Sequence, residues 1–216
     1  MCGIAGIFSK IISEDMEEKW FKMFDHLSHR GPDGQDYFKN SNNIMFHKRL
    51  SIIDIEGGKQ PIENRRYVLV ANGEIYNDIE IRKQNKNYNF ISLSDCESIL
   101  CVYEKYGING FEKLRGMFTF VIYDKITNEL ILGRDEFGIK PLYFCFQDQT
   151  FIYSSEIQSI IKSKIVKANL NRNKIQELSQ LQFTTGRNTI FDGILRLRPG
   201  EILMLKDYKI KSSKII

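Results

Sequence analysis

The sequence predicts an α+β fold in which two antiparallel β-sheets face each other and helices cover their outer faces. Residues 117–123 (MFTFVIY) are apolar at nearly every position, which is typical of a strand covered on both faces. Short strand signals recur along the chain with turn residues between them, which favours antiparallel pairing. Two further segments carry apolar residues at helical spacing and would bury one face against a sheet. A layered sandwich satisfies all three observations, and 216 residues are enough to give it a core.

The first third of the chain contains a strand, a helix and then a strand-rich region. Residues 3–8 have the composition of a first strand. The apolar residues at helical spacing that follow are Met16, Trp20, Met23, Phe24 and Leu27. The sequence HRGP at 29–32 ends this pattern. We then expect strands at 44–47, 50–55 and 67–71, with turns at Gly57–Gly58 and Asn72–Gly73.

A second helix is expected after residue 94, because Ser94 and Glu97 have the spacing of a capping box. Its predicted buried face consists of Cys96, Ile99, Leu100 and Tyr103. Gly107 predicts its end, since glycine commonly terminates helices.

The chain after this helix reads as a run of antiparallel strands. The expected strands are 117–123, 130–132, 142–146 and 151–153. Polar residues at 125–128 and 147–150 separate them in the manner of hairpin turns. No linker or repeat divides the chain, so we treat residues 1–216 as one domain with its core within about 1–200.

The composition argues against several classes of partner. The chain is 42% hydrophobic and 27% charged, and its net charge of +4 is spread among scattered Lys and Arg residues. We therefore expect no nucleic-acid partner. No apolar run is long enough to cross a bilayer, and the start lacks the basic residues of a signal peptide. We expect a cytoplasmic protein without a membrane partner.

The four cysteines show neither a C-x-x-C pair nor a Cys/His set with zinc spacing, so no metal site is expected. Cys96, Cys101 and Cys145 lie in apolar patterns and are explained as small buried hydrophobes. Cys2 is not explained in this way, although a chance cysteine at the terminus is the plain alternative. The three histidines, at 26, 29 and 47, are not spaced as ligands and are expected to have structural roles.

Nine short sequence blocks share one order along nearly the whole chain. They are CGI at 2–4, HRGPDG at 29–34, RLSIID at 49–54, NGEIYN at 72–77, SD at 94–95, RGMF at 115–118, RDEFGIKPLY at 134–143, SSE at 154–156 and TIFDG at 189–193. In this order and spacing the chain resembles the class II glutamine amidotransferases, specifically the glutamine-dependent asparagine synthetases. The resemblance implies the four-layer αββα sandwich of the N-terminal nucleophile hydrolases.

The resemblance also implies a mechanism in which Cys2 is the nucleophile and its own α-amino group is the general base. This chemistry requires removal of Met1, because only then is the nitrogen of Cys2 an amine. An α-amine and a thiol ordinarily have pKa values within about one unit of each other, so proton exchange between them is feasible near neutral pH.

The remaining site residues are assigned by the same resemblance. The Asn72 side-chain amide and the Gly73 N–H would stabilise the oxyanion. Arg49 would hold the α-carboxylate of glutamine, while Glu74 and Asp95 would receive its α-ammonium group. The backbone around Ile53 would add contacts to the substrate.

Each of these residues also has a plainer explanation. Asn72–Gly73 is a strong hairpin-turn signal. A carboxylate such as Asp95 near a helix start is favoured by the helix dipole whatever its function. Arg49 and Glu74 fit solvated surface charges.

The function that the resemblance implies is the glutaminase half of an asparagine synthetase, which passes ammonia from L-glutamine to an ATP-dependent synthetase domain. The alternatives are an amidotransferase half for a sugar acid or sugar phosphate, and a non-catalytic domain that retains the fold. The sequence contains no Gly-rich ATP pyrophosphatase loop. We therefore expect no cofactor in this domain, with ATP and Mg needed only in a synthetase domain of the full-length chain or of a separate protein. The oligomeric state stays open, a homodimer among the options.

Overall fold

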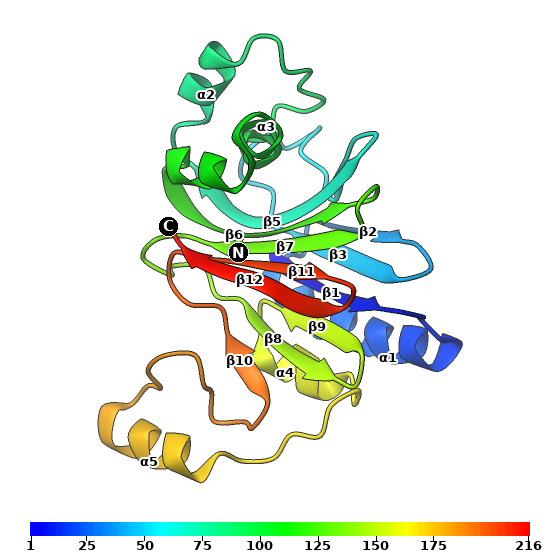
Figure 1. The fold of residues 1–216 in the computed structure, drawn as a ribbon, viewed down its shortest axis with the longest axis vertical. Helices are drawn as coiled ribbons and strands as arrows, with labels where there is room; N and C mark the ends of the chain where they lie inside the picture. The colour runs from blue at the N-terminus through cyan, green and yellow to red at the C-terminus, as the bar shows by residue number, and fades with distance from the viewer.

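A computed structural model describes residues 1–216, and it contains two six-stranded antiparallel sheets packed face to face (Figure 1). The first sheet has the order β10-β8-β9-β1-β3-β2. Its strands are β10 (Ile194–Arg196), β8 (Tyr143–Gln147), β9 (Thr150–Ser154), β1 (Gly3–Ser9), β3 (Asn43–Arg49) and β2 (Gly34–Lys39). The second sheet has the order β12-β11-β7-β6-β5-β4. Its strands are β12 (Lys209–Ile215), β11 (Glu201–Lys206), β7 (Glu129–Arg134), β6 (Gly116–Asp124), β5 (Tyr67–Ile75) and β4 (Ile62–Glu63).

Helices cover the outer face of each sheet, which completes four layers (Figure 1). The covering helices are α1 (Glu14–Asp25) and α4 (Ile157–Lys162) on the first sheet, and α2 (Asp78–Gln84) and α3 (Glu97–Tyr106) on the second. Helix α5 (Arg172–Leu181) has no buried residue and lies apart from the sheets (Figure 1). Two 3-10 turns are η1 (Ser28–Arg30) and η2 (Gly107–Lys113). One apolar cluster joins α1 and α4 to the first sheet, a second joins α2 and α3 to the second sheet, and a third fills the space between the sheets. The predicted αββα sandwich is therefore confirmed. None of the helices is long and apolar enough to cross a membrane.

Strand β6 confirms the prediction that residues 117–123 are covered on both faces. Phe118, Phe120 and Ile122 pack into the cluster under α2 and α3. Val121 and Tyr123 point the other way and pack between the two sheets. This alternation follows from the period of two along a strand.

Two of the predicted elements are wrong, and both lie beside the site. Residues 50–55 form a loop instead of a strand, because β3 leaves the sheet after Arg49, and Ile52 and Ile55 are exposed. Asn72–Gly73 is not a turn. Both residues lie inside β5, where Gly73 is opposite Phe118 of β6. A Cβ atom at Gly73 would lie 2.3 Å from the Met117 carbonyl oxygen, so glycine is needed for the close approach of these strands.

The predicted capping box at Ser94 and Glu97 is also wrong. Helix α3 begins at Glu97 with Cys96 as its N-cap, and no side chain caps it. The Glu97 carboxylate accepts hydrogen bonds from the N–H groups of Ile91 and Ser92 instead. Gly107 does end the helix, with a φ of 62° that favours glycine.

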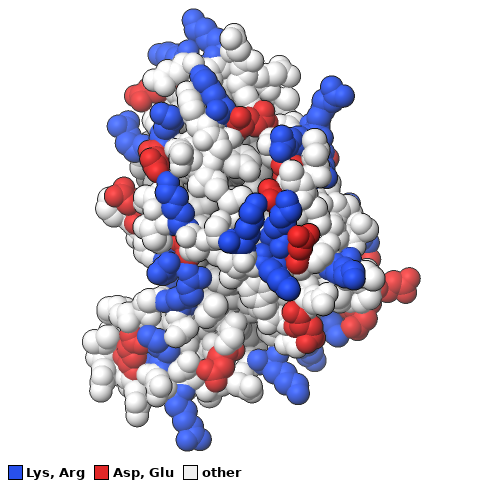
Figure 2. Space-filling model, in the orientation of Figure 1, with Lys and Arg blue, Asp and Glu red and all other residues white.

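Charged side chains are intermixed on the face of the molecule shown in Figure 2, where Lys and Arg alternate with Asp and Glu. The surface ion pairs of the protein include Lys211 with Glu129 and Lys214 with Glu112. No extended field of one sign builds up on this face.

Candidate active site

The fold brings the start of β1 and the end of β5 together at one edge of the space between the sheets. On β1, Ile4 and Phe8 point into this space, so Cys2 points the same way by the period of two. On β5, Val68 and Val70 point into it from the opposite sheet, and Asn72 continues their row. The thiol and the amide therefore approach each other from opposite sheets.

A pocket of about 160 Å³ opens at this edge, and all the site residues predicted from the sequence line it. They are Cys2, Arg49, Ile53, Asn72, Gly73, Glu74 and Asp95. Met1, His47, Gln60, Cys96 and Lys140 also contribute to its wall. Residues from six of the nine matched sequence blocks thus line one cavity.

The thiol of Cys2 is held by the backbone of Leu50, the residue after β3. The Leu50 N–H donates to Sγ over 3.3 Å, and the thiol contacts the Leu50 carbonyl oxygen at 3.6 Å. A second cysteine, Cys96, also lines the pocket, but complete burial raises the pKa of its thiol well above the usual value. Cys2 is partly exposed, whereas the other three cysteines are buried. Cys2 is therefore the one cysteine that a substrate can reach.

Arg30 holds the backbone of Cys2 from the end of the 3-10 turn η1. Its Nε donates to the Cys2 carbonyl oxygen over 3.0 Å, and its Nη1 pairs with Glu156 at 2.8 Å. Burial alone would raise the pKa of Glu156, but hydrogen bonds from Arg30 and His29 outweigh it and lower this pKa. The sequence leaves Arg30 without a role, although its HRGP block and the SSE block around Glu156 both belong to the matched pattern. The structure assigns both residues to the anchoring of the terminus.

Asn72 presents a buried hydrogen-bond donor that the protein does not satisfy. The residue is 2% exposed, and its amide nitrogen Nδ2 has no hydrogen-bond partner. Buried polar groups are nearly always paired, since an unmet donor costs about 1–3 kcal/mol. An orphan donor in a pocket beside a thiol is suited to an acceptor that arrives with the substrate.

The N–H of Gly73 supplies a second unpaired donor, which follows from the strand register. Gly73 is opposite Phe118, whose N–H and carbonyl both bond to Asp135 on the far side of β6. The backbone groups of Phe118 therefore point away from β5, which makes Gly73 and Phe118 a non-hydrogen-bonded pair of the antiparallel ladder. In such a pair the N–H of Gly73 also points away from β6. The neighbouring amides on this edge, those of Ala71 and Ile75, donate to the side chains of Gln60 and Asp95. Gly73 lies between them, at the pocket.

Arg49 reaches the pocket from the end of β3 and organises the loop that follows. Its guanidinium donates to the carbonyl oxygens of Ile53, Asp54 and Ile55 at 3.3, 2.5 and 3.0 Å. Three of its five N–H donors are used in this way. The remaining donors are free for a ligand, and the Ile53 carbonyl is oriented by the same cation.

Asp95 and Glu74 bring carboxylate groups to the wall of the pocket opposite Arg49. Asp95 Oδ2 accepts a 2.6 Å hydrogen bond from the Ile75 N–H, while the Glu74 carboxylate forms no hydrogen bond or ion pair within the protein. Burial, together with nearby Asp78, raises the pKa of Asp95, and the bond from Ile75 opposes this shift.

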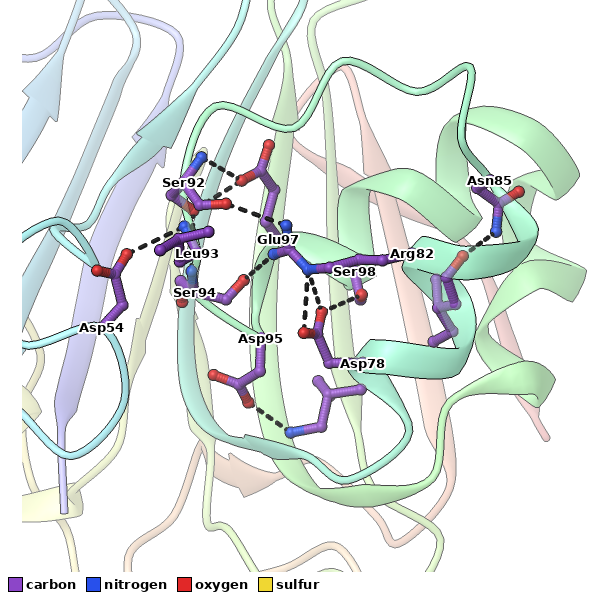
Figure 3. A network of polar contacts seen from close by, with 12 residues as sticks. Asp54, Asp78, Arg82, Asn85, Ser92, Leu93, Ser94, Asp95, Glu97 and Ser98 are labelled. Carbon is purple, nitrogen blue, oxygen red and sulfur yellow. Dashed lines mark hydrogen bonds and ion pairs between the residues drawn. The ribbon is translucent and has the colours of Figure 1, made fainter.

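A polar network fixes the loop that carries Asp95 (Figure 3). Arg82 pairs with Asp78 at 2.8 Å and donates to the carbonyl oxygens of Ser92 and Ser94. The carboxylate of Asp54 accepts from the Leu93 N–H at 3.0 Å, which ties this loop to the one held by Arg49. The two pocket walls are therefore linked to each other.

The fold is shared with two solved enzyme structures of low sequence identity. The glutamine phosphoribosylpyrophosphate amidotransferase of B. subtilis superposes with a TM-score of 0.69 and 18% identity, over 99% of this chain and 49% of that one. A structure described as the allosteric regulatory enzyme of purine biosynthesis gives a TM-score of 0.70 and 19% identity over the same shares. This chain therefore shares its fold with these two structures, in agreement with the sandwich that the sequence predicted.

A family model described as the glutamine amidotransferase domain matches residues 1–215, and the chain belongs to this family. Asparagine synthetase [glutamine-hydrolyzing] 1 of Bacillus subtilis is 36% identical over 93% of the chain. Asparagine synthetase B of Escherichia coli is 37% identical over 74% of it. The chain covers 33% and 30% of these two proteins, so it spans about a third of the length of its relatives.

Proposed function

We propose that this domain hydrolyses L-glutamine to glutamate and ammonia, with the thiol of Cys2 as nucleophile. The observation that carries the proposal is the pocket itself. It combines a reachable thiol, the orphan amide of Asn72 and the N–H of Gly73, which the strand register leaves unpaired. These are the parts that acyl transfer requires, namely a nucleophile and two donors for the oxyanion.

The reaction takes place in two acyl-transfer steps. The α-amine of Cys2 accepts the thiol proton, and the thiolate attacks the side-chain carboxamide carbon of glutamine. The C–N bond then breaks, and the proton passes to the leaving nitrogen, which departs as ammonia. Water next attacks the γ-glutamyl thioester, the amine takes a proton from it, and cleavage of the C–S bond returns that proton to the thiol. No histidine is needed at any step.

The walls of the pocket match the ends of glutamine. Arg49 retains donors for the α-carboxylate, and the partly exposed Glu74 offers an unpaired carboxylate to the α-ammonium. An ammonium beside Asp95 would offset the burial that raises its pKa. Ile53 would complete the pocket through its oriented backbone.

The ammonia would be used by an ATP- and Mg-dependent synthetase domain, in the same chain or a partner, that amidates aspartate. The named relatives, which are glutamine-hydrolysing asparagine synthetases, support this acceptor over a sugar acid or sugar phosphate. All four cysteines are free thiols, which fits the reducing cytoplasm, where we place the protein.

The test compares glutaminase kinetics with the intact mass of each preparation. Met1 lines the pocket beside Cys2, and while it is attached the nitrogen of Cys2 is an amide without a basic lone pair. Activity should therefore rise in proportion to the fraction of chains that begin at Cys2. Full activity in chains that retain Met1 would contradict the role of the amine, and no ammonia release from processed chains would contradict the proposed function.

A further inference from the structure

The edge of β5 that carries Asn72 and Gly73 lacks a neighbouring strand. β4 pairs with β5 only at Val68 and Leu69, so the edge is bare from Ala71 onward. A bare edge is ordinarily free to shift, because its backbone groups have no fixed partners. Here two buried side chains replace the missing strand at Ala71.

The first of these side chains is His47 of β3. Its Nε2 lies 3.1 Å from the Ala71 carbonyl oxygen, and the residue is 1% exposed. A carbonyl can only accept, so Nε2 carries the proton and donates it. Burial lowers the pKa of His47 to about 3; the bond to Ala71 opposes this shift and the charge of Arg49 adds to it. The imidazole is neutral at physiological pH, with one proton committed to Ala71.

The second side chain is Gln60, which is also buried. Its Oε1 accepts a 2.6 Å hydrogen bond from the Ala71 N–H. Both backbone polar groups of Ala71 are thus held by side chains, one from the opposite sheet and one from the loop before β4. His47 and Gln60 themselves line the pocket.

We propose that His47 and Gln60 form a clamp on Ala71 that positions the oxyanion donors of Asn72 and Gly73. The Ala71 carbonyl belongs to the peptide group that leads into Asn72, so the bond from His47 sets the rotation of that peptide. The rotation of this peptide group in turn sets the direction of the Asn72 side chain and of the Gly73 N–H. The clamp acts only through these donors, and the inference rests on the proposed function.

The test uses two substitutions at one position. His47→Leu removes the donor to Ala71, whereas His47→Gln places an amide N–H near the position of Nε2. We expect His47→Leu to lower kcat for glutamine about 10- to 100-fold, because displacement of an oxyanion donor approaches the effect of its loss. KM should change by less than about threefold, since the residues assigned to glutamine binding stay in place, and His47→Gln should restore most of kcat.

A second measurement distinguishes a loss of donor positioning from a general disruption of the active site. Alkylation of Cys2 by iodoacetamide displaces iodide at a saturated carbon and forms no oxyanion, so it does not need the donors. Its rate, followed by the mass of the Cys2 peptide, should be the same in the wild type and both variants. Met45→Val, two residues earlier on the same face of β3, perturbs packing between the sheets without touching Ala71 and should retain wild-type kcat.

Three outcomes would overturn the clamp, and a fourth concerns the proposed function itself. The clamp fails if His47→Leu hydrolyses glutamine at the wild-type rate, if hydrolysis and alkylation fall together, or if His47→Gln is as slow as His47→Leu. A wild-type protein whose Cys2 is alkylated but which releases no ammonia from glutamine would instead remove the proposed function, and the clamp with it.

Discussion

Replacement of Asn72 by leucine should lower glutaminase activity without lowering the stability of the fold. Leucine has nearly the shape of asparagine but no donor, and the Asn72 amide nitrogen is buried without a partner. Loss of one oxyanion donor typically lowers the rate by about 10²–10³, which corresponds to about 2.7–4 kcal/mol. The folded protein loses no hydrogen bond from this nitrogen and is relieved of an unmet donor, so its stability should be unchanged or higher by about 1 kcal/mol.

The assay pairs glutaminase kcat/KM with urea unfolding of Asn72→Leu and the wild type. The reasoning predicts a large fall in kcat/KM at equal or greater unfolding free energy. A loss of stability above about 2 kcal/mol would mean that the amide nitrogen has a partner in the folded protein. Activity within a few-fold of wild type would exclude Asn72 as an oxyanion donor.

Three further predictions follow from the same geometry. Cys2→Ala and Cys2→Ser should abolish glutamine hydrolysis while leaving the thermal midpoint nearly unchanged, because Sγ forms hydrogen bonds only with the Leu50 backbone; residual turnover near the wild-type rate would exclude Cys2 as nucleophile. Arg49→Lys should raise KM for glutamine at least about tenfold, since one ammonium cannot hold three loop carbonyls and a carboxylate, and an unchanged KM would remove Arg49 from the site. His47 should make the wild type lose stability faster than His47→Gln as pH falls from about 6.5 to about 3, by up to about 1.4 kcal/mol per pH unit. The sign follows because the unfolded chain binds a proton in this range and the folded chain does not; parallel pH–stability curves would show that His47 is not buried in the neutral form.

The layers and most strands could be predicted from the hydrophobic pattern, because β1, β6 and β7 are almost wholly buried and their residues are largely apolar. The site could be predicted only from the matched motifs. Residues such as Arg49 and Asp95 are 46 positions apart, and no local pattern shows that they share a pocket. The order of the strands in the sheets brings these residues together, and the hydrophobic periodicity of the sequence does not determine that order.

The wrong predictions have a common cause, which is that each short sequence signal was outweighed by contacts that the signal itself does not include. Asn72–Gly73 has turn chemistry, yet pairing with Thr119 and Phe118 keeps it in a strand. Residues 50–55 are rich in Leu and Ile like a strand, but the Arg49 guanidinium binds the carbonyls at 53–55 and the segment has no sheet partner. Glu97 has capping-box spacing, but its carboxylate bonds to the loop at 91–92. In each case a contact outside the local pattern changed the outcome.

The roles of Arg30, His47 and Gln60 were not predicted because each acts on backbone atoms of a distant residue. Arg30 binds the Cys2 carbonyl, while His47 and Gln60 bind Ala71. A sequence shows the side chain but not the carbonyl or amide that it will meet. Only the register of β1, β3 and β5 makes these contacts visible.

The most direct test of the central claim is to trap the covalent intermediate. Processed protein would be mixed with glutamine, quenched in acid within one turnover and analysed by peptide mass. The mechanism predicts the addition of one glutamyl group to the peptide that begins at Cys2, which should be cleaved by hydroxylamine as a thioester and absent in Cys2→Ser. Ammonia release without any adduct on Cys2, or an adduct on Cys96 in its place, would contradict the mechanism.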